Sequence, residues 1–244
     1  ASLIDPKDYY KFTYATDALG FKYIFDYAER MHQPCVINFS EGSSQDFHGY
    51  DQLYYELLAK LIGPGRIIVS SAGNDGARNS YIHKNIGKER AGAFIMGNEK
   101  RFSCTAKSKQ TFTFRVSVYD NVASPQIVDI STVNVCNAQD SLLTDSLLVG
   151  GKKYIWRVLA YPNSYDTSET AYDFQISSPS KLGDSPQVSL QVMGRDADIE
   201  LYRMSGYMFP HSLDPVLDAG DCRYTIFSPS SSPDVICVGS TSYR

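Results

Sequence analysis

The chain reads Ile-Ile-Val-Ser-Ser-Ala-Gly-Asn-Asp-Gly over residues 67–76. An apolar, β-branched run gives way to small residues and ends at Asn74, just before the turn pair Asp75-Gly76. This pattern predicts a buried strand that delivers one amide side chain to its carboxyl end. In an open parallel sheet, ligands and catalytic groups gather at that edge. The stretch therefore predicts a parallel sheet with a functional group at the end of one strand.

A helix is expected before this strand. The predicted helix covers residues 16–32, with Thr16 or Asp17 as its N-cap, and Pro34 ends it. Apolar side chains recur every four residues and define the face that we expect to be buried: Leu19, Tyr23, Tyr27 and Met31, with Ala18, Phe25 and Ala28 beside them.

Three apolar segments have the character of buried strands. Residues 35–39 and 67–71 are separated by a second predicted helix over residues 50–61, and residues 235–239 lie far downstream. Short links between alternating helices and strands favour a parallel sheet with covering helices. We expect all three strands in one parallel sheet, covered on both faces.

The middle of the chain follows a different pattern. From about residue 101 to residue 205 the apolar period falls to two, as in residues 111–118, and turn clusters separate about seven short segments. This predicts an antiparallel sandwich or jelly roll. The predicted fold is an α/β parallel-sheet core, residues 1–90 and 206–244, interrupted by an inserted β-sandwich over residues 91–205.

Three segments resemble, in order, the sequences of subtilisin-like serine proteases. Residues 36–42 resemble that family's Val-Ile-Asn-Met-Ser-Leu-Gly, residues 70–76 resemble Ala-Ala-Ala-Gly-Asn-x-Gly, and residues 232–239 resemble Tyr-Pro-x-Val-Ile-x-Val-Gly. The resemblance covers roughly residues 10–80 and 228–240. It implies an internal fragment of a subtilase, with a jelly roll inserted between the second and third segments.

The resemblance also implies roles for individual residues. Asn74 would be the catalytic contribution, donating its side-chain N–H to the oxyanion of the tetrahedral intermediate. Residues 40–42 would pair with the substrate backbone as an added strand, and residues 71–73 would form one wall of the primary specificity pocket. The implied substrate-binding residues are thus Ser40, Glu41, Gly42, Ser71, Ala72 and Gly73.

Glu41 departs from the family pattern, which usually has Leu at this position. An acidic side chain there would favour basic substrate side chains. The alternative is a solvated charge at the rim of the cleft.

The catalytic triad is not recognisable in the chain. By the resemblance, the Asp and His should precede residue 1 and the Ser should follow residue 244. His48-Gly49 stands in the wrong order, and Gly239-Ser240 lies where the family has an ordinary strand end. We therefore expect no peptidase activity from this chain alone. The alternative is a pseudoprotease, or a non-catalytic module whose inserted jelly roll binds carbohydrate or protein.

Composition narrows the choice of partners. The net charge is −4 and no basic run occurs, which argues against nucleic acid as a partner. No apolar stretch is long enough to span a membrane. The resemblance implies a polypeptide substrate and a bacterial protein that is secreted, periplasmic or on the cell surface.

No cofactor or metal is expected. The five cysteines, at positions 35, 104, 136, 222 and 237, lack metal-site spacing, and we expect Cys35 and Cys237 to be buried thiols within strands. Asp196, Asp198 and Glu200 alternate along a predicted strand, which suits either calcium or an acidic strand edge.

Overall fold

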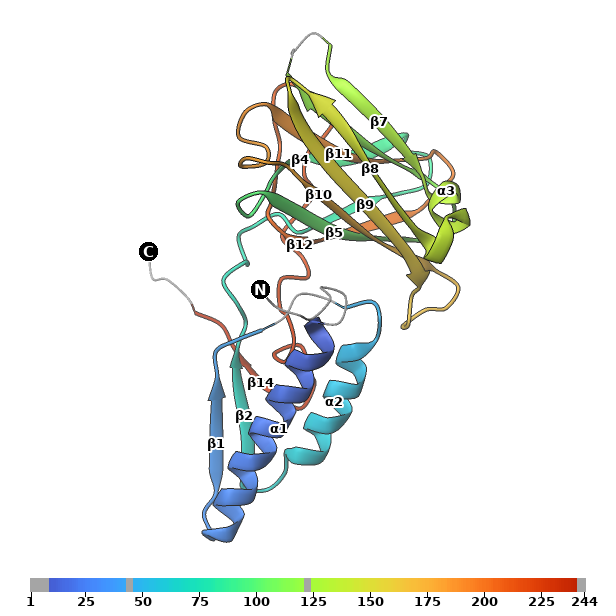
Figure 1. The fold of residues 1–244 in the computed structure, drawn as a ribbon. Coiled ribbons are helices and arrows are strands. Elements are labelled where there is room, and N and C mark those ends of the chain that lie inside the picture. Colours follow the sequence, from blue (N-terminus) through green and yellow to red (C-terminus); the bar gives the residue numbers. More distant parts are fainter. Residues whose placement is uncertain (1–8, 43–45, 121–123, 241–244) are drawn as a thin grey trace. The chain divides into compact units, whose positions relative to one another are not determined.

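The chain divides into two compact units in the computed structural model of Figure 1, which describes residues 9–42, 46–120 and 124–240. We call residues up to 76 together with those from 225 the parallel unit, and residues 77–224 the antiparallel unit. The sequence places these boundaries at 90/91 and 205/206. The observed boundaries differ from the predicted ones because residues 81–84 form a strand that pairs with residues 199–202 and so belong to the antiparallel unit.

The parallel unit contains two helices and a three-stranded sheet. Its elements are α1 (Tyr9–Arg30), β1 (Cys35–Phe39), α2 (Tyr50–Leu61), β2 (Arg66–Ser71) and β14 (Ile236–Val238). The strand order is β1-β2-β14 and both pairings are parallel, with Val36 opposite Ile67 and Ile236 opposite Val69. The predicted pairing of these three segments in one parallel sheet is confirmed.

Only one face of this sheet is buried. Ile37 and Ile68 point to the side of the helices and join a core with Phe21, Phe25 and Leu58. On the other face apolar side chains remain open to solvent: Val36 is 64% exposed, Ile67 37%, Ile236 50% and Val238 52%. The expectation of cover on both faces is therefore wrong for the described residues.

The cysteines of these strands are also more open than expected. Cys35 is half-buried and Cys237 is exposed, and both are free thiols. Cys237 lies on the short edge strand β14, where packing reaches it from one side only.

The buried face of α1 is only partly the predicted one, because Ala18 and Phe25 are buried as expected and the main predicted series is not. The helix begins at Tyr9, so Thr16 and Asp17 lie within it and do not cap it. The side chains that pack into the core recur at spacings of four, three and four: Tyr14, Ala18, Phe21 and Phe25. The main predicted series is open to solvent, with Leu19, Tyr23, Tyr27 and Met31 all more than half exposed.

The antiparallel unit is a sandwich of two sheets. Its elements are β3 (Tyr81–Lys84), β4 (Arg90–Met96), β5 (Arg101–Ser108), β6 (Thr113–Tyr119), β7 (Gln126–Ser131), α3 (Thr132–Asn137), the 3₁₀ turn η1 (Gln139–Ser141), β8 (Leu142–Val149), β9 (Lys152–Pro162), β10 (Thr170–Ser177), β11 (Gln187–Met193), β12 (Ile199–Ser205) and β13 (Tyr207–Phe209). One sheet has the order β3-β12-β5-β10-β9-β8 and the other β13-β4-β11-β6-β7. A single apolar core, which includes Phe102, Phe114 and Phe174, joins the two sheets.

The predicted fold class is wrong. The described residues form mostly antiparallel sheets with few helices, and the parallel part is one small sheet, which is not an α/β subtilisin-like core. The error has a physical origin. The continuous apolar runs suggested strands enclosed by helices on both sides, but the described chain supplies helices for one face alone. No helix among the described residues is long and apolar enough to cross a membrane.

The two ends of the antiparallel unit lie together. The backbone N–H groups of Ser80 and Tyr81 both donate to the carbonyl oxygen of Asp221, at 2.8 and 3.1 Å. Met208 on β13 lies opposite Ile95 on β4. The unit thus leaves and rejoins the rest of the chain at nearly one place, an arrangement that suits an inserted domain.

Residues 77–224 should fold when expressed alone, because their core and all their sheet pairings are internal. We expect a β-type circular dichroism spectrum and a cooperative urea transition followed by the fluorescence of Trp156, the only tryptophan. A disordered product would show that the sandwich needs the parallel unit.

Candidate functional site

The carboxyl ends of the three parallel strands lie at one edge of the sheet. Phe39 pairs with Ser70 and Ser71 pairs with Val238, so residues 40–42, residues 72–74 and Gly239 all follow at this edge. We call these residues the carboxyl edge. It contains every residue of the predicted site except Ser71, which is the last residue of β2.

Asn74 lies in a bend three residues beyond the end of β2 and is exposed. Within the described ranges its side chain makes no hydrogen bond. An asparagine that serves only to build a turn bonds to the backbone about two residues on. The amide of Asn74 is instead available to a group that approaches from solvent.

The segment that would wall a specificity pocket is fixed by β14 and the loop before it. The N–H of Ala72 donates to the carbonyl of Val238 at 2.9 Å, and the hydroxyl of Ser230 donates to the carbonyl of Ser71 at 2.5 Å. Gly73 has φ +92°, a left-handed conformation that strains any residue with a side chain. These contacts orient the backbone that leads into Asn74.

The loop of residues 225–232, which precedes β14, also reaches the end of β1. The hydroxyl of Tyr55 on α2 is hydrogen-bonded to the hydroxyls of Ser228 and Ser231. A Cβ placed on Gly42 would lie only 3.0 Å from the carbonyl oxygen of Ser228. Glycine at position 42 therefore lets this loop approach the predicted substrate strand. Sequence reasoning missed Tyr55 and these serines, which are far apart along the chain.

Gly42→Ala should destabilise the parallel unit by about 1 kcal/mol, since a Cβ there forces backbone against backbone. Gly20→Ala is the matched control. Gly20 is an exposed helix residue with open space around its Cα, so alanine should stabilise the unit by roughly 0.5–1 kcal/mol. Urea unfolding followed by the helical circular dichroism signal reports on this unit, which holds both long helices. Equal effects of the two substitutions would contradict the proposed crowding at Gly42.

The carboxylate of Asp17, which the sequence suggested only as a helix cap, lies near Glu41. Burial, and next the charge of Glu41, raise the pKa of Asp17 to about 6. Burial, followed by the charge of Asp17, also raises the pKa of the Tyr54 phenol. Residues 41, 17 and 54 come from the end of β1, from α1 and from α2. No local motif contains all three, which is why sequence reasoning did not connect them.

Asp17→Asn should stabilise the parallel unit above pH 6 and have little effect below pH 4. The raised pKa means that the folded state prefers protonated Asp17, so its contribution to stability is lost as the pH rises from 3.8 to about 6. The variant does not undergo that loss. Urea unfolding between pH 4 and pH 7, followed by the helical signal, measures the difference.

The control for this measurement is Glu29→Gln, which removes an exposed negative charge at the other end of the same helix. The fluorescence of Trp156 reports separately on the antiparallel unit. A benefit of Asp17→Asn that is largest at pH 4 would reverse the inferred sign and show that Asp17 is stabilised as the anion.

The antiparallel unit contains a charged hollow of about 370 Å³. It is lined by His83, Ile86, Lys107, Lys109, Gln110, Glu169, Asp198 and Glu200. Its charges are mutually paired: Lys107 lies 2.6 Å from Glu200 and 3.3 Å from Glu169, and His83 lies 2.6 Å from Asp198.

The acidic series considered for calcium is not a strand face. Asp196 and Asp198 precede β12, and only Glu200 lies on it. Among the described residues no group of three or more histidine, cysteine or acidic side chains is arranged to hold a metal.

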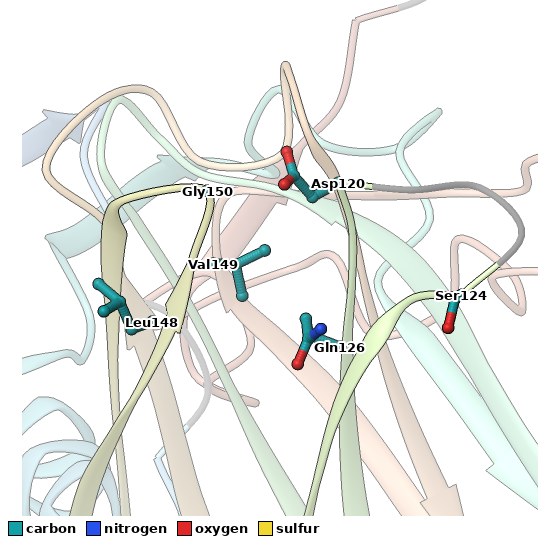
Figure 2. Close-up of a pocket in the computed structure, with 6 residues that line it drawn as sticks. All are labelled: Asp120, Ser124, Gln126, Leu148, Val149 and Gly150. Carbon is teal, nitrogen blue, oxygen red and sulfur yellow. The ribbon is translucent and has the colours of Figure 1, made fainter.

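Figure 2 shows a second hollow in the antiparallel unit, with a volume of about 170 Å³. The end of β8, followed by Gly150, forms one side of it, and the start of β7 forms the other. Leu148, Val149 and Gln126 line it with the carboxylate of Asp120. It has one charged side chain, and we assign no chemistry to it. Neither hollow includes a residue of the predicted site.

The chain was compared with known proteins. No protein-family model and no curated protein sequence matches it. Among solved structures it is similar to the CspB protease of Clostridium perfringens, with a TM-score of 0.63 and 16% sequence identity. The match covers 94% of this chain and 47% of that protein, so the chain spans about half of the protease's length. At this identity the likeness shows the fold alone, and the fold of this chain is protease-like.

Proposed function

We propose that this chain is the part of a serine endopeptidase that binds the substrate backbone and stabilises the oxyanion. The observation that carries the proposal is the position of Asn74. It follows the central strand of the parallel sheet, is exposed, and makes no side-chain hydrogen bond within the described ranges. The protease-like fold supports the same assignment.

The chemistry assigned to Asn74 is the donation of a side-chain N–H to the oxygen of the scissile carbonyl. That oxygen becomes negative in the tetrahedral intermediate, and a donor already in position stabilises it without reorganisation. A donor with no internal partner costs nothing to redirect. The free amide of Asn74 meets this requirement.

The substrate would be an extended polypeptide. Residues 40–42 continue β1 beyond its last pairing with β2, and all three are exposed. Backbone groups in such a position can pair with an added strand. Ser71, Ala72 and Gly73 would form the facing wall, where small side chains leave room for a substrate side chain.

In this proposal the nucleophile and the general base come from polypeptide outside this chain. The isolated chain should therefore not turn over casein and should not be labelled by a fluorophosphonate probe. Stoichiometric labelling of a serine in residues 1–244 would overturn the assignment.

Asn74→Ala is the decisive substitution. It is made in a polypeptide that contains this chain together with the proposed nucleophile and general base. We expect kcat to fall about 10²–10³-fold with little change in KM, since the donated bond forms in the transition state. Steady-state kinetics on a peptide substrate measure both constants. Asn74→Asp is the matched variant, because it keeps the size and removes the donor, and it should be at least as impaired. An unchanged kcat in either variant would leave Asn74 as a turn residue.

The second candidate is a non-catalytic binding module, and the charged hollow of the antiparallel unit gives it a specific location. The paired charges there suit a polar ligand such as a carbohydrate. Two results together would favour this candidate over the endopeptidase. The polypeptide that contains this chain with the proposed nucleophile and base would lack hydrolytic activity, and Glu169→Gln would abolish carbohydrate binding.

A further inference from the structure

Two ring contacts fix the position of Asp17 on α1. The ring of Tyr14 stacks on that of Tyr54 with centroids 4.8 Å apart, and Phe21 meets Phe39 edge-on at 5.0 Å. Asp17 is three residues after Tyr14 and four before Phe21, so all three share one helix face. Asp17 thus lies between α2 and the end of β1.

Glu41 is two residues beyond Phe39, at the carboxyl edge. After burial, its charge is the second cause of the raised pKa of Asp17. Within the described ranges neither carboxylate forms an ion pair with lysine or arginine. Burial of Asp17, together with the charge of the exposed Glu41, disfavours the ionised form of Asp17. The position is therefore electrostatically complementary to a cation.

The phenol of Tyr54 adds an independent observation. Tyr54 is only 1% exposed, and its hydroxyl has no hydrogen-bond partner among the residues that the structure describes. The charges of both Asp17 and Glu41 act on this hydroxyl. Buried hydroxyl groups are nearly always hydrogen-bonded, so an unpaired one on which two carboxylate charges act points to a missing polar group.

We propose that Asp17, Glu41 and Tyr54 form a subsite that binds an arginine side chain of the polypeptide substrate. The inference rests on the proposed function, because Glu41 belongs to the segment that would pair with the substrate backbone. A guanidinium is planar, permanently charged and has five N–H donors. It can donate to both carboxylates and to the phenol oxygen, which satisfies all three groups together.

The charged hollow of the antiparallel unit does not offer the same vacancy. In the hollow of the antiparallel unit, Glu169 and Glu200 already contact Lys107, and Asp198 contacts His83. A cationic ligand there would have to displace a resident cation. At Asp17 and Glu41 it would relieve a repulsion.

The test compares two sets of fluorescein-labelled short peptides on residues 1–244. In each set one position carries either arginine or citrulline, which has the same shape without the charge, and that position is scanned along the peptide. Fluorescence anisotropy at pH 7.5 gives Kd. At one position we expect arginine to bind about tenfold more tightly than citrulline, because hydrogen bonds between charged groups are involved.

Three variants locate the effect. Asp17→Asn and Glu41→Gln should each reduce the preference for arginine to about threefold or less. Tyr54→Phe should also reduce it while leaving the chain no less stable, because the hydroxyl it removes has no partner within the described part of the chain. Glu29→Gln is the charge-matched control on the same helix, about 18 Å from Asp17, and should leave the preference intact.

The pH dependence provides a further readout. Glu41 and Tyr54 are the ionisable groups that face Asp17, and Asp17 gains a proton below about pH 6. The preference for arginine should therefore shrink between pH 7.5 and pH 5. A circular dichroism spectrum of each variant shows whether the helices have formed.

The possible failures are distinguishable. Equal binding of arginine and citrulline at every position would overturn the subsite and leave peptide binding standing. Absence of binding by both sets would overturn the proposed function and the subsite with it. A preference that survives both Asp17→Asn and Glu41→Gln would assign the cation to other residues.

Discussion

The parallel pairing of β14 with β2 is the contact on which the candidate site depends. It places Ile236 opposite Val69 and Val238 opposite Ser71, although the antiparallel unit separates these residues along the chain. Residues 225–232 lead directly into β14, so the same pairing brings Ser228 and Ser230 to the edge where Asn74 lies. Asn74 itself follows β2, the central strand of the three that the structure describes in the parallel sheet. The oxyanion donor of the proposal is thus held by the best-supported strand of the unit.

The pairing of the three strands could be predicted from the sequence, but the environment of their faces could not. Continuous β-branched runs such as residues 67–69 identify strands, since they fit a pleated surface. They do not say how many faces are covered, because that depends on helices elsewhere in the polypeptide. On α1 the apolar pattern is ambiguous for a related reason. Leu19 and Tyr23 lie on one side and Phe21 and Phe25 on another, and only contact with Phe39 and Leu58 selects the second set.

The residues of the candidate site also fall into two groups: those that the local sequence could predict and those that only tertiary contacts reveal. Asn74 could be predicted because its meaning is local: a strand, three small residues and an amide before a turn. Asp17, Tyr54 and Ser228 could not, because each acquires its role from contacts with residues distant in sequence. Glu41 lies between these cases. Its position was visible as a departure from a family pattern, but its acidic neighbour appears only once α1 packs against β1.

The two proposed roles belong to different elements of the parallel unit, so substitutions in one should have little effect on the other. Asp17 and Glu41 belong to α1 and the end of β1, whereas Asn74 follows β2 and is held in place through β14. Substitutions at separate positions without shared partners usually have additive effects on free energy. A change at Glu41 should therefore alter which substrate binds and leave oxyanion stabilisation intact, while a change at Asn74 should do the reverse. Such a division allows substrate preference to vary on one protease-like fold while the catalytic donor stays fixed.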